Sequence, residues 1–337
     1  MKVLVTGATG FLGKALARRL HARGDQVTAL GRNPSILAEL EREGLRPLRA
    51  DLGAGAAIRA ACQGQEIVFH AGALSSAWGS AEAFFRANVL GTRHVIAGCE
   101  AAGVRRLVHV STPSIYFRFE SRLDVREDAP LPAQPANEYV RTKLLAEAEI
   151  DRAFGRGLPV ITIRPRAIFG EGDNAILPRL ISRLASGRLR VIGDGQNLTD
   201  LTYVENVVDA LILCAEAPET LLGRKYNITN GEPLPLWGLI RQVCEALGYA
   251  YPQKRIPYPT AIGLATVLEV VSRILPGQPE PLLTRYMVGV LAKSTTLDIS
   301  AACRELGYAP RVSVQEGFER FVIWWKTHNP LIDTNFH

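Results

Sequence analysis

Three glycines close to the amino terminus constrain the fold of this chain most strongly. They are Gly7, Gly10 and Gly13. They follow an apolar strand pattern over Lys2–Thr6 and lead into a helical pattern over Phe11–Arg23, whose first turn contains Gly13. A strand, a tight turn and a helix in this order place free N–H groups and the positive end of a helix dipole beside the turn, which favours an anion. Gly7 permits the sharp turn, Gly10 lets a pyrophosphate approach the backbone, and Gly13 lets the helix pack closely on the sheet. The loop therefore predicts a dinucleotide site.

Strand and helix patterns alternate through the first half of the chain. Further strands are predicted at Gln26–Leu30, Leu45–Ala50, Ile67–Ala71, Arg106–Ser111 and Val160–Arg164, and further helices at Ala54–Cys62, Ala81–Ala102 and Tyr139–Phe154. Strands that alternate with helices indicate a parallel sheet with helices on both faces. The predicted fold class is therefore α/β, a Rossmann-type doubly wound sheet.

The length of the chain predicts a second lobe. Its 337 residues, 47% of them hydrophobic, exceed what one core usually holds. Pro and Gly become frequent after Pro165, and helical patterns dominate from Leu236 onward. We expect a dinucleotide-binding domain of residues 1–170 plus about 201–229. A smaller, mostly helical C-terminal substrate lobe would contain about residues 171–200 plus 230–337.

Tyr139 and Lys143 form a candidate proton-handling pair. Their four-residue spacing places them on one face of a predicted helix. A free tyrosine has a pKa of about 10, and a neighbouring ammonium lowers that pKa by stabilising the phenolate. A tyrosine tuned in this way can exchange a proton with a substrate oxygen. The pair therefore predicts general acid–base chemistry.

Together, these motifs resemble the extended short-chain dehydrogenases/reductases of the NAD-dependent epimerase/dehydratase superfamily. The spacing of the glycine loop matches that family, Tyr139 and Lys143 follow it at the family's distance, and further matches extend along nearly the whole chain. The resemblance implies an NAD(P)-dependent oxidoreductase in which Tyr139 and Lys143 are catalytic.

The resemblance also assigns roles to other positions. In Ser111-Thr112-Pro113-Ser114, Thr112 stands in the place of the family's catalytic serine or threonine, with Ser111 as the alternative. Asn88 stands where the family has an asparagine that orders the active site. The implied cofactor contacts, beyond Tyr139 and Lys143, are Gly7, Thr9, Gly10, Phe11, Leu12, Gly13, Arg32, Asp51, Leu52, Ala71, Gly72, Ala73, Ser111, Pro165 and Ile168.

The end of the second strand favours NADP as the cofactor. NAD enzymes usually carry Asp or Glu there, hydrogen-bonded to the ribose 2′-hydroxyl. This chain has Gly31-Arg32, and the guanidinium of Arg32 suits a 2′-phosphate. NAD stays possible if Arg32 is only a solvated loop residue.

Five short segments resemble the 3β-hydroxysteroid dehydrogenase branch, and within it the bacterial 2-alkyl-3-oxoalkanoate reductases of olefin biosynthesis. They are Ser111-Thr112-Pro113-Ser114, Arg164-Pro165-Arg166, Gly172-Asp173-Asn174, Leu177-Pro178-Arg179 and Asn230-Gly231-Glu232-Pro233. The resemblance implies interconversion of a secondary alcohol and a ketone on a bulky hydrophobic substrate, such as a 2-alkyl-3-oxo acid or a 3β-hydroxysteroid. The alternatives are a nucleotide-sugar epimerase and a non-catalytic dinucleotide-binding protein.

Two segments suggest how such a substrate would bind. The apolar stretches Ala261–Leu275 and Leu282–Leu291 could form the wall of an apolar pocket, or simply the core of the second lobe. A carboxylate beside the ketone could meet an arginine such as Arg166 or Arg179, because the planar guanidinium suits a carboxylate.

Charge and cysteine content narrow the range of partners. The net charge is +6, but the Lys and Arg residues are spread along the chain, so no nucleic-acid partner is expected. The five cysteines are scattered and form no Cys-x-x-Cys pair, which indicates reduced thiols and no metal site.

The remaining patterns bear on location and assembly. The amino-terminal apolar run is too short for a signal peptide, so a cytoplasmic protein is expected. The segment Thr260–Leu275 contains Glu269 and Arg273 and is shorter than the roughly 20 residues of a membrane span. It is interpreted as a helix in the core, as a lid, or as a weak membrane-surface contact. The resemblance implies a homodimer.

Overall fold

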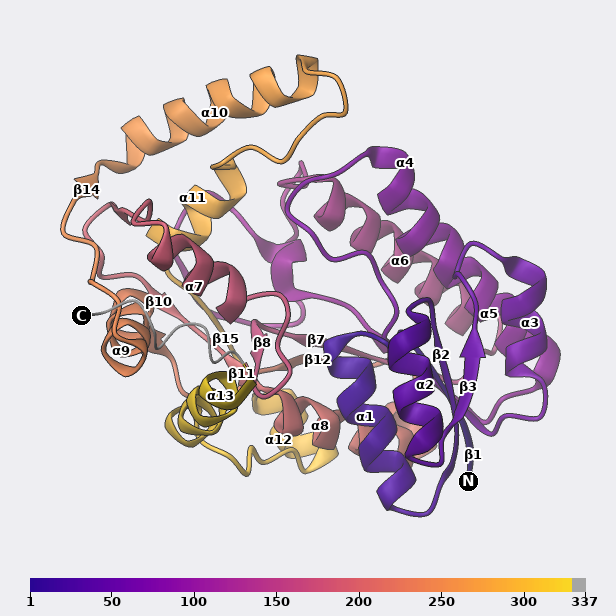
Figure 1. Ribbon diagram of the computed structural model, residues 1–337. Coiled ribbons are helices and arrows are strands. Elements are labelled where there is room, and N and C mark those ends of the chain that lie inside the picture. The colour runs from indigo at the N-terminus through magenta and orange to yellow at the C-terminus, as the bar shows by residue number, and fades with distance from the viewer. Residues whose placement is uncertain (329–337) are drawn as a thin grey trace.

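A parallel sheet of seven strands forms the centre of the larger part of the molecule (Figure 1). The computed structural model describes residues 1–328. The strand order is β12-β7-β5-β4-β1-β2-β3, and every neighbouring pair is parallel. The strands are β1 (Lys2–Thr6), β2 (Gln26–Gly31), β3 (Arg46–Arg49), β4 (Ile67–His70), β5 (Arg106–Val110), β7 (Val160–Pro165) and β12 (Lys225–Ile228). The predicted Rossmann-type fold is confirmed.

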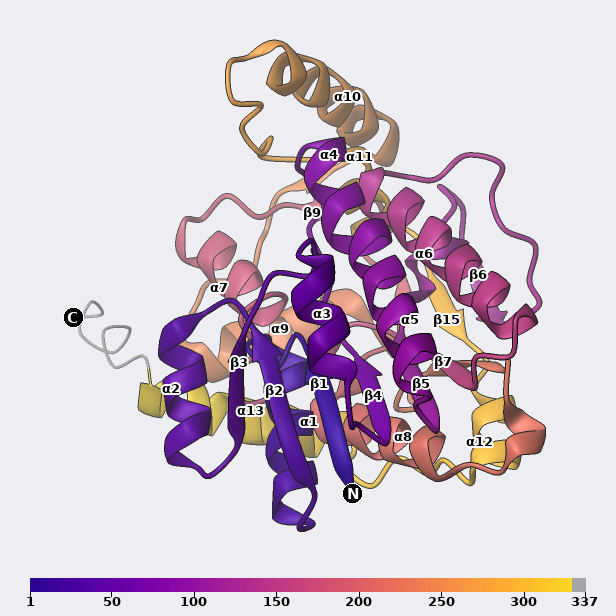
Figure 2. The ribbon, with the colours of Figure 1, turned by 90° about the vertical axis from the view of Figure 1, so that its right-hand side faces the viewer.

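Helices cover both faces of this sheet (Figures 1 and 2). One face packs against α1 (Phe11–Ala22), α2 (Pro34–Arg42), α8 (Val204–Glu216) and α12 (Ser300–Leu306), and the other against α3 (Gly55–Cys62), α5 (Gly91–Ala102) and α6 (Glu138–Gly155). Successive strand residues point to opposite faces, so Val5 joins the first cluster and Leu4 the second. Both are fully buried, and each such side chain stabilises the fold by about 1.5–3 kcal/mol.

The predicted helix over residues 81–102 is continuous but contains a π-helical turn. It consists of α4 (Ala81–Phe84), the π-helical segment η1 (Phe85–Leu90) and α5. The hydroxyl of Thr92, in the first turn of α5, donates to the carbonyl oxygen of Asn88 in the π-helical segment at 2.6 Å. Such turns inside α-helices are frequent at functional sites, and this one carries Asn88.

The smaller part of the molecule is mostly helical, as predicted. Its helices are α7 (Leu177–Ala185), α9 (Leu236–Leu247), α10 (Tyr258–Ile274), α11 (Arg285–Ala292) and α13 (Val314–His328). Short strands accompany them: β8 (Ile168–Phe169), β9 (Val191–Ile192), β10 (Leu198–Thr199), β11 (Thr202–Tyr203), β13 (Leu234–Pro235), β14 (Arg255–Ile256) and β15 (Thr295–Leu297). Its core includes Phe169, Trp237, Ile240 and Phe321.

Two segments cross between the two parts. Strand β6 (Arg122–Val125), which lies early in the chain, pairs with β15 in the sheet β13-β10-β15-β6. Helix α12 lies late in the chain, yet its Ala302 and Leu306 pack in the cluster under the central sheet. The division into a first lobe of residues 1–170 plus 201–229 and a second of residues 171–200 plus 230–337 stays a prediction. Strand β6 and helix α12 each pack against the other lobe.

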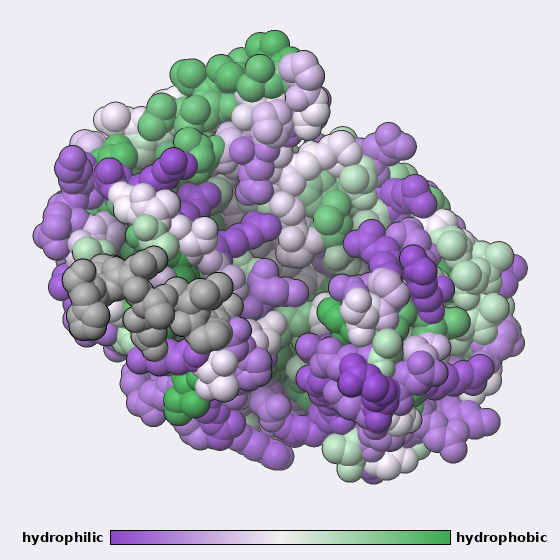
Figure 3. All heavy atoms as spheres, in the orientation of Figure 1, coloured by the Kyte–Doolittle hydropathy of each residue, from purple (hydrophilic) through white to green (hydrophobic). Residues whose placement is uncertain are grey.

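Helix α10 lies at the edge of the molecule and exposes most of its large apolar side chains (Figures 1 and 3). Ala261, Ala265 and Glu269 face inward and are buried, whereas Val267 is 60% and Ile274 78% exposed. The interpretation as a core helix therefore holds only for its narrow inner face. Within residues 1–328, none of the helices combines the length and the apolar character that a membrane crossing requires.

Candidate active site

The glycine loop has the close backbone contacts that its sequence predicts. Gly7 has a φ of +74°, and a Cβ atom there would lie 2.6 Å from the Cα atom of Gly72 at the end of β4. A Cβ atom on Gly13 would lie 2.2 Å from the carbonyl oxygen of Gly7. Helix α1 begins after Gly10, which supplies no side-chain cap, so N–H groups of its first turn remain available to an anion. This loop fits the pyrophosphate of a dinucleotide.

Other predicted cofactor residues gather at the same carboxyl edge of the sheet. The side chain of Leu52 lies against Gly72, the Thr9 side chain lies against Gly31, and the Phe11 ring approaches Gly172. Leu12 and Ile168 are both partly buried on the same apolar clusters, and Pro165 ends strand β7. Ala71, Gly72 and Ala73 follow β4 directly. In open parallel sheets this edge is where nucleotide ligands bind.

Arg32 lies at the end of β2 and is 72% exposed. Its Nη1 atom is 3.4 Å from the Asp51 carboxylate, and Arg86 approaches the same carboxylate at 3.7 Å. The Asp51 carboxylate also accepts from the N–H of Gly53 at 2.8 Å. Two guanidinium groups therefore lie beside the predicted adenosine end of the site.

Helix α6 presents Tyr139 and Lys143. The Asn137 side chain accepts from the N–H of Val140 at 2.9 Å, so it caps the helix just before Tyr139. The Lys143 ammonium donates to the carbonyl oxygen of Val110, at the end of β5, at 2.8 Å. Burial lowers the pKa of Lys143 to about 8, against the opposing effect of the Glu147 carboxylate.

The prediction that Lys143 lowers the pKa of Tyr139 is wrong for this structure. Burial raises the pKa of the Tyr139 phenol, and the nearby hydroxyls of Thr112 and Ser75 offset only part of that rise. The reason is that burial removes the water that would solvate a phenolate, while the Lys143 ammonium is directed to Val110. Burial therefore favours the protonated phenol of Tyr139 over the phenolate.

The structure distinguishes the two candidate hydroxyls on the loop after β5. Thr112 lies beside Tyr139 and lowers its pKa, whereas the Ser111 hydroxyl lowers the pKa of Glu147. Thr112 also donates to Ser114 Oγ at 3.1 Å, and Ser114 Oγ is 2.9 Å from the phenol oxygen of Tyr286 on α11. A row of hydroxyl groups thus leads from Tyr139 to the second lobe.

Asn88 fixes the loop that carries Ser75. Its Oδ1 atom accepts from the N–H of Leu74 at 2.7 Å, and its Nδ2 atom donates to the carbonyl of Leu74 at 3.1 Å. Nδ2 also lies 3.1 Å from the hydroxyl of Thr142, which is next to Lys143 on α6. Asn88 is buried and connects the π turn, this loop and α6.

A buried ion pair supports the site, and the sequence did not predict it. Arg164 and Glu147 are both buried, and their side chains meet at 2.6 Å. Arg164 also donates to the phenol of Tyr116, and Lys225 lies 3.5 Å from Glu147. The spacing of four residues from Lys143 to Glu147 is a signal that could identify this acid. Ser75 and Tyr286 have no comparable local signal.

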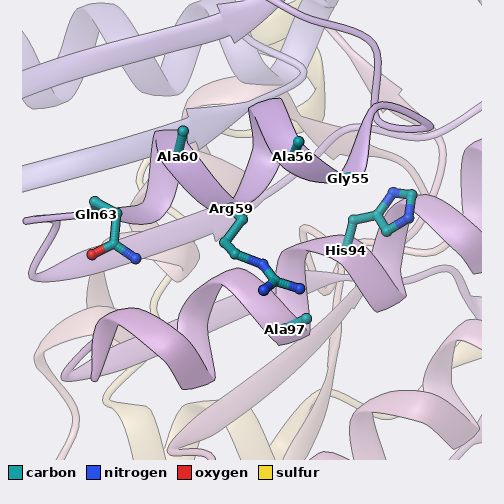
Figure 4. Close-up of a pocket in the computed structure, with 7 residues that line it drawn as sticks. All are labelled: Gly55, Ala56, Arg59, Ala60, Gln63, His94 and Ala97. Atoms are coloured by element: carbon teal, nitrogen blue, oxygen red, sulfur yellow. The ribbon is translucent and has the colours of Figure 1, made fainter.

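A hollow between α3 and α5 lies away from these groups (Figure 4). It is lined by Gly55, Ala56, Arg59, Ala60, Gln63, His94 and Ala97. The His94 ring is held by the carbonyl oxygen of Leu52, 2.8 Å from Nδ1. The reactive hydroxyls, Lys143 and the glycine loop are all elsewhere, so this hollow is no part of the candidate active site.

Comparisons with known proteins agree with this geometry. The sequence profile of the NAD dependent epimerase/dehydratase family matches residues 3–229. The 2-alkyl-3-oxoalkanoate reductase of Stenotrophomonas maltophilia is 39% identical over 325 residues, which cover 95% of this chain and 98% of that protein. The sterol-4-alpha-carboxylate 3-dehydrogenase, decarboxylating, of Homo sapiens is 33% identical over 328 residues, covering 94% and 86%.

A solved structure of MoeE5 in complex with UDP-glucose and NAD superposes with a TM-score of 0.76 at 28% identity, covering 98% of this chain and all of that one. The profile spans the glycine loop, α6 and the strands that hold them. The two relatives are named as a reductase and a dehydrogenase, and the match to this chain covers most of the length of each. This chain therefore belongs to the NAD-dependent epimerase/dehydratase family, and it is a nicotinamide-dependent oxidoreductase that acts on CH–OH groups.

Proposed function

We propose that this enzyme reduces the ketone of a bulky hydrophobic 3-oxo acid, such as a 2-alkyl-3-oxo acid, with NADPH. The observation that carries the proposal is the partly buried Tyr139 phenol beside Thr112 and Ser75, whose pKa is raised by the loss of solvation. A phenol that stays protonated at neutral pH is suited to give its proton to a carbonyl oxygen. The oxoalkanoate and sterol-carboxylate substrates named for the two relatives support an acid of this kind.

Each proposed role follows from position. The nicotinamide, when bound, supplies the hydride that adds to the carbonyl carbon. The Tyr139 hydroxyl donates its proton to the carbonyl oxygen, which becomes the alcohol, and the Thr112 hydroxyl holds that oxygen in line. Lys143 brings positive charge next to the strand end at Val110, and Asn88 fixes the loop that carries Ser75. The glycine loop and Arg32 hold the phosphates.

The apolar side of the substrate is proposed to lie against α11 and its neighbours. The Phe117 and Tyr286 rings are 4.8 Å apart, and Phe117 packs directly on Gly289. Helix α10, which packs against α11, exposes further apolar side chains at the edge of the molecule (Figure 3). Substrate chain atoms that become buried here would add apolar contact area.

We expect kcat/KM to rise with the length of the substrate's alkyl chain. Each buried CH₂ group contributes about 0.8 kcal/mol, which is roughly a fourfold gain per methylene while the chain stays buried. The measurement is steady-state reduction of a homologous series of 2-alkyl-3-oxo acids, with UDP-glucose as the nucleotide-sugar control. A flat series, or turnover of the nucleotide sugar alone, would point to the epimerase alternative.

The cofactor is proposed to be NADP(H), because Arg32 and Arg86 lie where a 2′-phosphate would add negative charge. Replacing Arg32 with alanine should weaken NADPH binding roughly 10- to 100-fold, the loss of a hydrogen-bonded charge pair. NADH binding should change little. Fluorescence titration of both cofactors gives the four dissociation constants.

Arg42→Ala is the matched control, because it removes an exposed positive charge from the far end of α2. It should leave both dissociation constants unchanged. Equal affinity of the parent protein for NADPH and NADH would contradict the NADP proposal.

We further propose a cytoplasmic homodimer. The support for a dimer is the neighbouring helices α5 and α6, which the Arg93–Glu149 and Glu100–Arg156 ion pairs join. In the dehydrogenases that the chain resembles, such helices often form a two-fold interface.

The five free cysteines suit a reducing compartment. The exposed face of α10 supports a weak contact with a membrane surface.

A further inference from the structure

Arg166 is a guanidinium that the described fold leaves without a carboxylate partner. It lies in the turn between β7 and β8, where Ala167 adopts a φ of +43°. Within residues 1–328 it forms no ion pair, and its Nε atom is buried without a hydrogen-bond partner. Among the described residues its guanidinium forms one long hydrogen bond, 3.4 Å from Nη2 to the Thr199 hydroxyl. Buried polar groups are normally paired, so this side chain is set up for a partner outside the chain.

The neighbouring Arg164 shows the contrast. It lies two residues earlier on β7, and the Glu147 carboxylate, the Tyr116 phenol and the carbonyl of Glu127 satisfy its guanidinium. Such pairing is what a structural arginine in this core receives. Arg166 is only partly buried, but its Nε atom is buried without this compensation, and burial lowers its pKa.

The side chain of Tyr286 connects the surroundings of Arg166 with the catalytic hydroxyls. The Tyr286 phenol is close enough to influence both Arg166 and Tyr139, and its oxygen is 2.9 Å from Ser114 Oγ. In a 3-oxo acid only the α-carbon lies between the ketone and the carboxylate. Groups that bind these two functions must therefore be near neighbours, and Tyr139 and Arg166 are both close enough to Tyr286 to feel its charge.

Asp200 is the acidic group whose charge acts on Arg166. One of its carboxylate oxygens accepts from the N–H of Leu297 at 2.7 Å. Burial raises the pKa of Asp200 to about 6, and the carboxylate lies beyond ion-pair distance of Arg166, since no such pair is formed among the described residues. The other arginine that the sequence suggested, Arg179, is exposed on α7 and lacks this setting.

We infer that the guanidinium of Arg166 binds the carboxylate of the 3-oxo acid as a bidentate ion pair while Tyr139 acts on its ketone. This inference rests on the proposed function and adds the residue that selects acids over neutral ketones. A planar guanidinium and a carboxylate match in geometry and charge. Arg166 also keeps the carboxyl ionised, since its positive charge disfavours the neutral acid.

The test compares a freshly hydrolysed 2-alkyl-3-oxo acid with its methyl ester. In Arg166→Met, kcat/KM for the acid should fall about 10- to 100-fold, while the value for the ester changes less than about threefold. Arg166→Lys should recover part of the acid activity, because it restores the charge without the planar geometry. Arg179→Met is the control, and kcat/KM for both the acid and the ester should stay unchanged in it.

Equal losses for acid and ester would overturn the inference and indicate a structural role for Arg166. A second readout needs no turnover: calorimetric binding of the corresponding 3-hydroxy acid to the enzyme loaded with NADP. A dissociation constant unchanged by Arg166→Met would also overturn it. Failure of the parent enzyme to reduce either ketone would refute the proposed function, and the binding experiment would still decide the role of Arg166.

Discussion

Replacing Tyr139 with phenylalanine is expected to lower kcat by about 10²- to 10⁴-fold, the usual contribution of a positioned proton donor. The variant keeps the ring and its contact with Phe84, whose centroid lies 6.4 Å from that of Tyr139. It loses only the hydroxyl that faces Thr112 and Ser75. Cofactor affinity should therefore stay close to that of the parent enzyme. Steady-state kinetics and cofactor titration measure the two effects separately.

Tyr249→Phe is the matched control, because it removes a phenol hydroxyl at the end of α9, away from the site. It should be as active as the parent. If Tyr139→Phe retained more than about a tenth of the parent kcat, another group would have to supply the proton.

Replacing Glu147 with glutamine is expected to lower the free energy of unfolding by about 3–5 kcal/mol, because it leaves a buried arginine without its counter-ion. Glu147 and Arg164 are both buried, and Lys225 adds a second cation at 3.5 Å. Although burial pushes the pKa of Glu147 up, Arg164 and Lys225 hold it below its ordinary value. The pair therefore stabilises the fold above that ordinary pKa, and this stability is lost as the pH falls through the folded-state pKa.

Urea denaturation at neutral pH measures the loss. Glu100→Gln is the control, because its ion pair with Arg156 is exposed and is expected to contribute at most about 1 kcal/mol. A loss in Glu147→Gln no larger than in this control would show that the buried pair does not hold the sheet and α6 together.

The parts of the fold that depend on local patterns are predictable from the sequence. The apolar run of β1 and the three glycines lie within a few residues of each other, and strand and helix periods alternate clearly up to β7. Helix α2 is missing from the predicted elements, although Asn33 and Pro34 form a helix-start signal and Asn33 accepts from the N–H of Ser35 at 3.0 Å. The π turn at Asn88 also has no distinct pattern of its own.

The site depends partly on burial and on distant segments, which a sequence pattern does not report. Ser75, Thr112 and Tyr286 meet around Tyr139 from three well-separated stretches of the chain. The direction of the Tyr139 pKa depends on how deeply the fold buries the phenol, which spacing from Lys143 cannot reveal. For α10, an apolar composition on most sides does not indicate which side has a partner.

The central claim is that this enzyme transfers a hydride between a nicotinamide and a ketone on a hydrophobic acid. The most direct measurement is the absorbance of NADPH or NADH during incubation with 2-alkyl-3-oxo acids, 3-oxosteroids and UDP-glucose, followed by identification of the products. The account predicts that NADPH is consumed with the 3-oxo acid and that an equal amount of the 3-hydroxy acid is formed. The account would be contradicted if UDP-glucose were epimerised while no ketone caused NADPH or NADH to be oxidised.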